Sequence, residues 1–320
     1  MWIEASAPSN IALIKYMGKT DPVNNRPCNS SLSYTLDHLR TFVRLQPGPQ
    51  LLEDQWRPFV RSDLRPIELS ETGKKKFLSF FAKLKKEFNL SGFYHIESAN
   101  NFPSDCGLAS SASSFAALTR AAYACSTTIQ KSELQLAQIS KLGSGSSCRS
   151  FSGPWVKWTS ESIEPVALPI SNLKHQVILC DESIKAVSSS QAHQLVLTSE
   201  LFLNRPERAE KRLQDLSESL SRGHWEEAFQ ICWNEFWDMH VLFHTSKPPF
   251  MYMTAGSQQV LRQILELWRS EKDGPLVTMD AGSNIHLLYR PDQTDTYKKY
   301  KSVFNPSFPM WTDEGYCAKS

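Results

Sequence analysis

The sequence predicts an α+β protein whose strands and helices do not alternate regularly. The first 50 residues read largely as strands, helical spacing follows at residues 77–88, and both halves of the 320-residue chain mix the two patterns. A doubly wound parallel sheet would need repeated strand–helix–strand units, which this pattern lacks. The length suits two domains, and we expect them at residues 1–170 and 171–320, with a soft boundary near residue 170.

Strands and one helix are predicted in the first hundred residues. Strand-like segments lie at residues 2–16, 31–36 and 41–45, and a further strand at 93–97 leads into a serine-rich loop. Apolar residues recur at helical spacing over residues 77–88 among several lysines. These lysines could form a basic binding surface. A helix with a buried apolar face and a solvated lysine face is the commoner arrangement, and we favour it.

The rest of the chain continues the mixture of helices and strands. An alanine-rich helix is expected at residues 110–125, and the capping-box pattern from Ser132 to Gln135 opens a second helix that stops at Gly143. The elements predicted after it are strands at 154–158 and 175–180, helices around 213–220 and 260–268, and paired strands at 275–280 and 285–289.

Composition excludes several classes of function. Charged residues make up 21% of the chain and nearly cancel to a net charge of +2, so no global field attracts nucleic acid. The first residues do not read as a signal peptide, and no apolar run has the length of a membrane span. Seven cysteines without a C-x-x-C pair fit a reduced protein. We therefore expect a cytoplasmic protein without nucleic-acid or membrane partners.

Two serine-rich loops are the most informative local features. Residues 103–114 (PSDCGLASSASS) run directly into a predicted helix, whose first backbone N–H groups and dipole would favour an anion. Residues 143–149 (GSGSSCR) end in an arginine, whose planar fork suits phosphate. Two such loops indicate two phosphorylated ligands or one highly charged ligand.

The loops match neither of the two common nucleotide-binding fingerprints. A Walker loop needs G-x-x-x-x-G-K-S/T, whereas Gly73-Lys74 lacks the earlier glycine and the following hydroxyl. A dinucleotide fingerprint needs G-x-G-x-x-G after a strand. Here Cys148 replaces the last glycine, and a helix precedes the loop.

Five sequence blocks together resemble a known family. Residues 103–111 resemble the P-x-x-x-G-L-x-S-S loop of the GHMP kinase superfamily. Within that superfamily the chain is similar to the diphosphomevalonate decarboxylases. The blocks that carry this similarity follow the family order and span most of the chain: APSNIALIKY at 7–16, NSSLS at 29–33, GLASSA at 107–112, GSGSSCRS at 143–150 and DAGSN at 280–284.

The resemblance implies a fold and an activity. The implied fold is the α+β GHMP kinase fold, with an N-terminal ribosomal-protein-like domain, a smaller C-terminal domain and the active site in the cleft between them. The implied reaction uses ATP and Mg²⁺ to phosphorylate the tertiary C3 hydroxyl of mevalonate 5-diphosphate. Loss of phosphate and carbon dioxide then gives isopentenyl diphosphate. A homodimer is also expected.

The same resemblance implies the site residues. The catalytic group would comprise Asp280, Lys15 and Arg149, and the substrate would be bound by Tyr16, Ser144, Ser146, Arg149 and Ser189. ATP would be bound by Ser104, Gly107, Leu108, Ser110 and Ser111. No protein ligand for the metal is implied, because Mg²⁺ would be held mainly by phosphates and water.

The residues themselves leave some of these roles open. Asp280 ends an apolar run before Ala281-Gly282, so it could face a cleft or simply begin a turn. Lys15 could neutralise charge beside it or snorkel from a strand to the surface. Ser189 is a weaker candidate, because serine triplets are usually plain loops.

Several positions depart from the family pattern, including residues 104–106 and 152–155. Met17 stands where tryptophan is usual, Asp105 adds an acid to the first loop, His193 replaces a methionine and Trp237 replaces an asparagine. Several of these changes are expected near the substrate. The closest alternatives are therefore a decarboxylase of mevalonate 5-phosphate or a kinase that stops at the 3-phosphate. An alternative of another class is a GHMP-fold regulator that binds its ligand without turnover.

Overall fold

The computed structural model describes residues 1–102, 110–181, 183 and 185–319. The N-terminal elements are β1 (Ile3–Ile14), β2 (Lys19–Asp21), β3 (Arg26–Pro27), β4 (Ser31–Pro47), β5 (Gln55–Pro58), β6 (Arg65–Pro66), α1 (Glu71–Glu87), β7 (Tyr94–Asn100), α2 (Ser110–Cys125), α3 (Glu133–Ser140), the 3₁₀ helix η1 (Gly145–Ser150), β8 (Trp155–Trp158) and β9 (Ile163–Pro165).

The C-terminal elements follow as β10 (Lys174–Ile178), α4 (Ser189–Leu195), the 3₁₀ helices η2 (Val196–Thr198) and η3 (Glu200–Phe202), α5 (Arg205–Arg222), α6 (Trp225–Thr245), α7 (Ala255–Glu271), β11 (Leu276–Thr278), β12 (Ile285–Tyr289), α8 (Thr294–Phe304), β13 (Met310–Thr312) and β14 (Gly315–Cys317). None of the described helices has the length and apolar character needed to cross a lipid bilayer.

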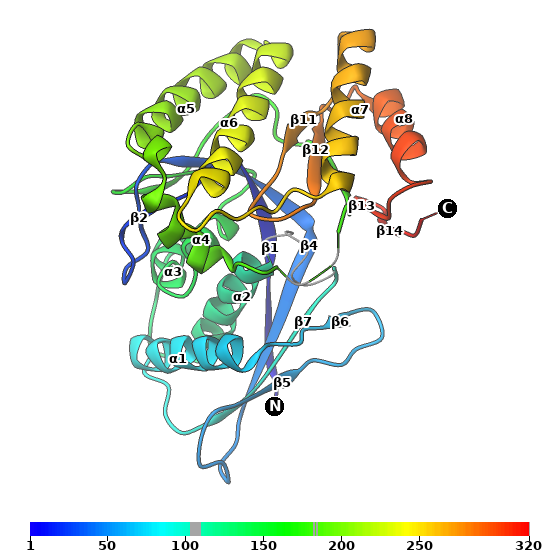
Figure 1. Cartoon of the computed structure of the whole chain (residues 1–320). Helices are drawn as coiled ribbons and strands as arrows, with labels where there is room; N and C mark the ends of the chain where they lie inside the picture. Colours follow the sequence, from blue (N-terminus) through cyan, green and yellow to red (C-terminus); the bar gives the residue numbers. More distant parts are fainter. Residues whose placement is uncertain (103–109, 182, 184, 320) are drawn as a thin grey trace.

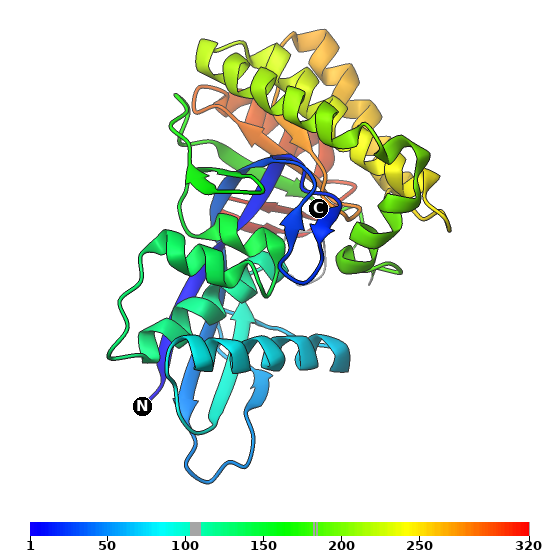
Figure 2. The same cartoon turned by 90° about the vertical axis from the view of Figure 1, so that its left-hand side faces the viewer.

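Two sheets organise the molecule. The first has the order β5-β7-β4-β8-β9, with β1 beside β4 and β6 beside β7, and its pairs are antiparallel except for β5 with β7. The second is antiparallel with the order β11-β12-β10-β13-β14. The long strands β1 and β4 run from the N-terminal half up to the C-terminal half (Figure 1). Helices α5, α6 and α7 cover one face of the second sheet (Figure 2).

The two halves share one hydrophobic core. The ends of β1 and β4 that face the C-terminal half contribute buried Ile11, Leu13 and Leu32, which pack in one cluster with Phe229 of α6 and Leu287 of β12. Residues of β1, β4, β7, α1 and α2 form a second core in the N-terminal half. Burial of apolar area is worth roughly 25 cal/mol per Å², so a shared core holds the two halves in a fixed relation. This relation sets the shape of the space between them.

The observed elements match most of the predicted ones. Helix α2 begins and ends at the predicted residues, and the Ser132 capping box is present at α3. The two strands predicted at 31–36 and 41–45 were wrong as separate elements, because β4 is one strand. It pairs with β1 on both sides of a bulge at residues 37–39, which lie between the partners of Pro8 and Ser9.

A chain of three histidines joins the two halves at the edge of the shared core. Nε2 of His38 lies 3.1 Å from Nδ1 of His175, whose Nε2 lies 3.0 Å from Nδ1 of His286. Nδ1 of His38 lies 3.4 Å from Asp313. Burial lowers the pKa of His38 to about 4 and that of His175 well below its ordinary value, and it raises the pKa of Asp313 to about 6. His38 and His175 are therefore neutral at pH 7.

We predict that the protein loses stability as the pH falls from 7 to 5.5. Burial also lowers the pKa of His193 and of His240 to about 3, so with His38 and His175 four native histidines resist protons that the unfolded chain binds below pH 6.5. Asp313 works in the opposite sense, because its raised pKa makes the native state the better proton acceptor. At pH 5.5 the unfolded chain therefore binds about three more protons than the native protein. Between pH 7 and 5.5 this difference lowers the unfolding free energy by up to about 4 kcal/mol.

Urea unfolding at the two pH values measures this loss. The variant His38→Gln should lose about 1 kcal/mol less than the wild type between them, because one titrating group is gone. The matched control is His224→Gln, since this side chain is 56% exposed and should leave the difference unchanged. Equal unfolding free energies of the wild type at both pH values would contradict the analysis.

Candidate functional site

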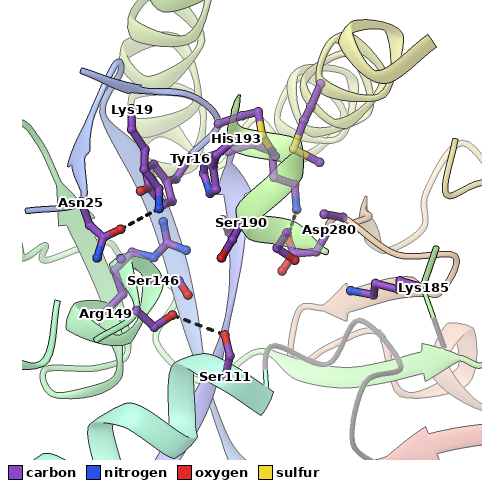
Figure 3. A pocket seen from close by; sticks show the side chains of 18 of the residues that line it. Tyr16, Lys19, Asn25, Ser111, Ser146, Arg149, Lys185, Ser190, His193 and Asp280 are labelled. Carbon is purple, nitrogen blue, oxygen red and sulfur yellow. Dashed lines mark hydrogen bonds and ion pairs between the residues drawn. The ribbon is translucent and has the colours of Figure 1, made fainter. Parts of the chain in front are cut away.

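A polar cavity that is partly open to solvent lies between the two halves. Its walls come from the end of β1 and the turn after it, the first turn of α2, the η1 segment, the start of α4, one residue of α6 and the turn that follows β11 (Figure 3). The predicted catalytic residues Lys15, Arg149 and Asp280 all line it. Asp280 is the single carboxylate among the described lining residues, so the cavity wall is strongly cationic.

Lys15 and Asp280 form an ion pair at the centre of the wall. Nζ of Lys15 lies 2.6 Å from Oδ1 of Asp280, and the lysine side chain is 2% exposed whereas the aspartate is 27% exposed. Of the two side chains, Asp280 is therefore the one more exposed to the cavity. Burial raises the pKa of Asp280, but the Lys15 ammonium and the hydrogen bond from it outweigh burial and hold this pKa below its ordinary value. Asp280 is ionised at neutral pH.

Local hydrogen bonds fix the position of Asp280. Its backbone carbonyl accepts hydrogen bonds from the Gly282 N–H at 2.8 Å and from the His240 ring at 3.1 Å. Asn284 closes the same turn, because its Oδ1 accepts the backbone N–H of Cys180 at 2.7 Å. The segment DAGSN thus forms a tight turn anchored to α6 and to the end of β10. The sequence left open whether Asp280 faces a cleft or begins a turn. In the structure it does both.

Arg149 lies on the opposite wall, on η1. Its Nε donates to Oδ1 of Asn10 at 3.2 Å and its Nη1 donates to Oγ of Ser31 at 2.7 Å. The side chain is 4% exposed, and its guanidinium carbon lies 5.8 Å from the centre of the Trp158 ring. Two neutral oxygens and an aromatic face hold the fork in place without neutralising it. The remaining N–H groups are therefore available to an anion in the cavity.

The GSGSSCR segment forms a serine-lined wall beside Arg149. Ser144 and Ser146 both line the cavity, and Oγ of Ser144 lies 3.3 Å from Oγ of Ser111 at the start of α2. Gly145 allows the close approach of Tyr16, because a Cβ at this position would lie 2.8 Å from the tyrosine ring and hydroxyl. The tyrosine hydroxyl is buried without a hydrogen-bond partner among the described residues. Burial keeps it protonated by raising its pKa far above the ordinary value.

The predicted ATP-binding residues are only partly described. Ser104, Gly107 and Leu108, with the departure Asp105, lie outside the described residues. Ser110 is the first residue of α2 and does not line the cavity, whereas the exposed side chain of Ser111 does.

The serine triplet is more than a plain loop. Ser188 caps α4, because its hydroxyl accepts the backbone N–H of Gln191 while the glutamine side chain accepts the Ser188 N–H. Ser189 and Ser190 form the first turn of this helix, and both line the cavity. Ser189 therefore faces the cavity, as predicted.

Several lining residues were not among the predicted site residues: Lys19, Asn25, Lys76, Lys185, Ser190, His193 and Met239. Lys19 donates to Oδ1 of Asn25 at 2.6 Å. Burial, followed by repulsion from Lys76, lowers the pKa of Lys19 to about 8. Lys76 belongs to the helix whose lysines we expected to be solvated. That prediction holds for the buried apolar face and is incomplete for Lys76, which is exposed but borders the cavity.

The departures from the family pattern separate into two groups. Met17 is 3% exposed, packs with Met239 and lines the cavity, and His193 lines it as well. Trp237 does not line it and packs instead against Trp233 and Phe236. Among the described residues, no group of three His, Cys, Asp or Glu side chains could hold a metal ion.

Comparisons with known proteins agree with this arrangement. Residues 7–165 match the diphosphomevalonate decarboxylase-like N-terminal domain, and residues 176–318 match the mevalonate 5-diphosphate decarboxylase C-terminal domain. The chain is 32% identical to the diphosphomevalonate decarboxylase of Debaryomyces hansenii over 316 residues, covering 90% of this chain and 79% of that protein.

Solved structures give the same result. The crystal structure of a mevalonate diphosphate decarboxylase from Legionella pneumophila has 45% identity and a TM-score of 0.89, covering 97% of this chain and 100% of that one. A structure of MDDEF in complex with MVAPP, AMPPCP and magnesium has 29% identity and a TM-score of 0.84, covering 95% and 94%. The fold is thus the GHMP kinase fold, and the chain belongs to the diphosphomevalonate decarboxylase family.

Proposed function

We propose that the protein catalyses the ATP-dependent decarboxylation of mevalonate 5-diphosphate to isopentenyl diphosphate in the mevalonate pathway of isoprenoid biosynthesis. The observation that carries the proposal is the 2.6 Å Lys15–Asp280 pair in a cavity that also holds the buried guanidinium of Arg149. A paired carboxylate suits an alcohol, and an unpaired buried guanidinium suits a carboxylate or phosphate. Relatives of the same family, including one bound to MVAPP and AMPPCP, support the choice of ligands.

The substrate would lie along the cationic wall. Its C3 hydroxyl would contact Asp280, and its carboxylate and diphosphate would be held by Arg149, Ser144, Ser146, Tyr16 and Ser189. Lys19 would add a further cation to the diphosphate. The free N–H groups of Arg149 and the serine hydroxyls are donors without acidic partners in the cavity, which makes them suited to a polyanion.

ATP would approach from the start of α2. The first backbone N–H groups of this helix and the hydroxyls of Ser110 and Ser111 would bind its phosphates, together with Ser104, Gly107 and Leu108 of the preceding loop. Mg²⁺ would be held mainly by phosphate oxygens and water, because the lining carboxylate Asp280 is already paired with Lys15. The metal would neutralise charge on the transferred phosphoryl group.

The reaction would proceed in two stages. The C3 oxygen forms a bond to the terminal phosphorus of ATP while the bond from that phosphorus to ADP breaks, and the hydroxyl proton passes to Asp280. The C3–O bond then breaks with loss of phosphate. The bond between the carboxylate carbon and its neighbour breaks too, and its electron pair forms the double bond as carbon dioxide leaves.

Asp280 would act mainly by orienting the hydroxyl. Its pKa is below the ordinary value of a carboxyl, which is far below that of an alcohol, so it is a weak base. Phosphoryl transfer has a loose transition state in which little early proton removal is required. Late acceptance of the proton, with Lys15 offsetting charge on the phosphoryl group, is consistent with both facts.

Other features of the protein remain predictions. We propose domains at residues 1–170 and 171–320, a homodimer and a cytoplasmic location. The cysteine content of the sequence supports the last of these, as does the absence of a disulfide among the described cysteines.

Product analysis tests the function. Incubation with ATP, Mg²⁺ and mevalonate 5-diphosphate should release carbon dioxide and ADP in equal amounts, and mevalonate 5-phosphate should react poorly. Turnover of the monophosphate alone would identify a phosphomevalonate decarboxylase, and ADP without carbon dioxide a 3-kinase. Neither product would identify a binding regulator and refute the proposal. The Lys15–Asp280 pair argues against a regulator, since ligand binding alone has little need of it.

We predict that Asp280→Asn lowers kcat by at least about 100-fold, the low end for a positioned acid–base group, and changes KM less than tenfold. The amide still contacts the hydroxyl but cannot accept its proton. Steady-state kinetics give both constants. Because the change leaves Lys15 without its anion, the melting temperature and the affinity for an ATP analogue must be compared with the wild type. A folded variant with near-normal kcat would end the assignment.

We predict that Arg149→Lys raises KM for the substrate about 10- to 100-fold, the worth of a hydrogen bond to a charged group. Lysine keeps the charge but cannot contact Asn10, Ser31 and the substrate through one planar fork. The matched control is Arg120→Lys, at a residue that pairs with Glu133 outside the cavity. Equal KM values for the two variants would show that the charge alone is sufficient.

A further inference from the structure

His193 occupies a distinctive position on the cavity wall. It lies on α4, is 9% exposed and lines the cavity together with Lys19 (Figure 3) and Lys76. The same three residues also line an adjoining hollow that includes neither Lys15 nor Asp280. His193 therefore lies where the cavity extends away from the ion pair, on walls that it shares with two lysines.

The hydrogen bonds of His193 define its tautomer. The backbone N–H of Gly18 donates to Nδ1 of His193 at 3.0 Å, so Nδ1 carries no proton. In a neutral ring the proton must then lie on Nε2, which becomes a donor. Within the described part of the chain, no group accepts a hydrogen bond from Nε2. The Tyr16 ring, with its centroid 4.3 Å from that of the imidazole, holds the ring plane in position.

The surroundings keep this ring neutral. Burial lowers the pKa of His193 to about 3, and Lys19, Arg149 and Lys76 each add repulsion against a second proton. The neighbouring cations supply charge that attracts an anion from any direction. A neutral N–H instead selects the position of its acceptor, because a hydrogen bond weakens steeply when the acceptor lies off the N–H axis.

We propose that His193 is a specificity-determining residue that donates its Nε2–H to the outer phosphate of the substrate's diphosphate. The inference rests on the proposed function. A substrate whose C3 hydroxyl contacts Asp280 would reach Lys19, Lys76 and His193 with its phosphate end only, since these residues continue into the hollow beyond the ion pair. A diphosphate fills this outer subsite, whereas a monophosphate leaves it to water. His193 thereby helps the site to distinguish the two substrates.

The competing explanation is that His193 only supports the turn at Gly18 through its Nδ1. Two amide variants separate the roles. In His193→Asn the side-chain oxygen can replace Nδ1 as acceptor for the Gly18 N–H, but the donor toward the cavity is lost. In His193→Gln the longer amide can bring an N–H donor to the place of Nε2, while the acceptor for Gly18 is displaced.

Steady-state kinetics with both substrates give the first test. His193→Asn should raise KM for mevalonate 5-diphosphate about tenfold or more, with little change in kcat or in the kinetics of mevalonate 5-phosphate, because one hydrogen bond to a charged group is lost. His193→Gln should keep KM within about threefold of the wild type. A larger rise in KM for His193→Gln than for His193→Asn, or equal effects on both substrates, would show that His193 only supports the turn at Gly18. Either result would overturn the inference.

Calorimetry with inorganic pyrophosphate and inorganic phosphate makes the test independent of turnover. Pyrophosphate should bind the wild type and His193→Gln with similar affinity, and it should bind His193→Asn about tenfold more weakly. The affinity for inorganic phosphate should be similar in all three proteins. If the wild type releases no carbon dioxide but this order holds, the proposed function fails and the role of His193 stands. Pyrophosphate binding that is absent from the wild type, or equal in all three proteins, overturns the inference. Melting temperatures confirm that the variants are folded.

Discussion

The site depends on one buried carboxylate, that of Glu235. It accepts the backbone N–H of Lys15 at 2.9 Å and forms ion pairs with Arg205 and, at 3.0 Å, with Arg212. Glu235 and Arg205 are completely buried. Transfer of such charges from water costs several kcal/mol per ion, and mutual attraction together with further hydrogen bonds offsets this cost. The backbone N–H of Lys15, just beyond β1, supplies one of these hydrogen bonds, so a shift of the strand along α6 would remove it from the carboxylate.

This constraint carries over to the chemistry. Helix α6 also holds the turn after β11, since His240 contacts the backbone carbonyl of Asp280. The two residues of the central ion pair, separated by 265 positions in the sequence, are thus attached to the same helix through their backbones. Their side chains meet because their main chains are fixed. Small rearrangements of the phosphate-binding loops need not disturb the pair.

Part of this organisation could be predicted from the sequence. Local signals were sufficient for α2 and for the Ser132 cap, because capping and helical spacing act within a few residues. The convergence of Lys15, Arg149 and Asp280 was predicted only through the resemblance to a family, since no periodicity relates residues so far apart. Each of the three now lines one cavity.

The missed features have physical reasons too. The break predicted within β4 falls on a bulge at residues 37–39, and it was wrong as a strand end because local propensity says nothing of a partner strand that pairs on both sides of the bulge. Lys76 was assigned to a solvated face because its helix is amphipathic, and the pattern cannot say which part of that face borders a cavity built by other elements. For His193 the sequence offered one signal, the departure from methionine, without the geometry needed to interpret it.

The cavity contains both charged residues, which attract an anion, and a neutral hydrogen-bond donor, which can orient it. Its fixed positive charges belong to lysines and an arginine, while buried His193 and His240 stay neutral, each with a pKa of about 3. These two histidines therefore add no charge to the local field through the pH range in which free histidines titrate, whereas Lys19, with a pKa of about 8, loses its charge at slightly alkaline pH. The local field exists without a strongly basic chain, because the net charge is only +2. In the proposed complex the cations would attract a polyanion, and neutral donors such as His193 would align it.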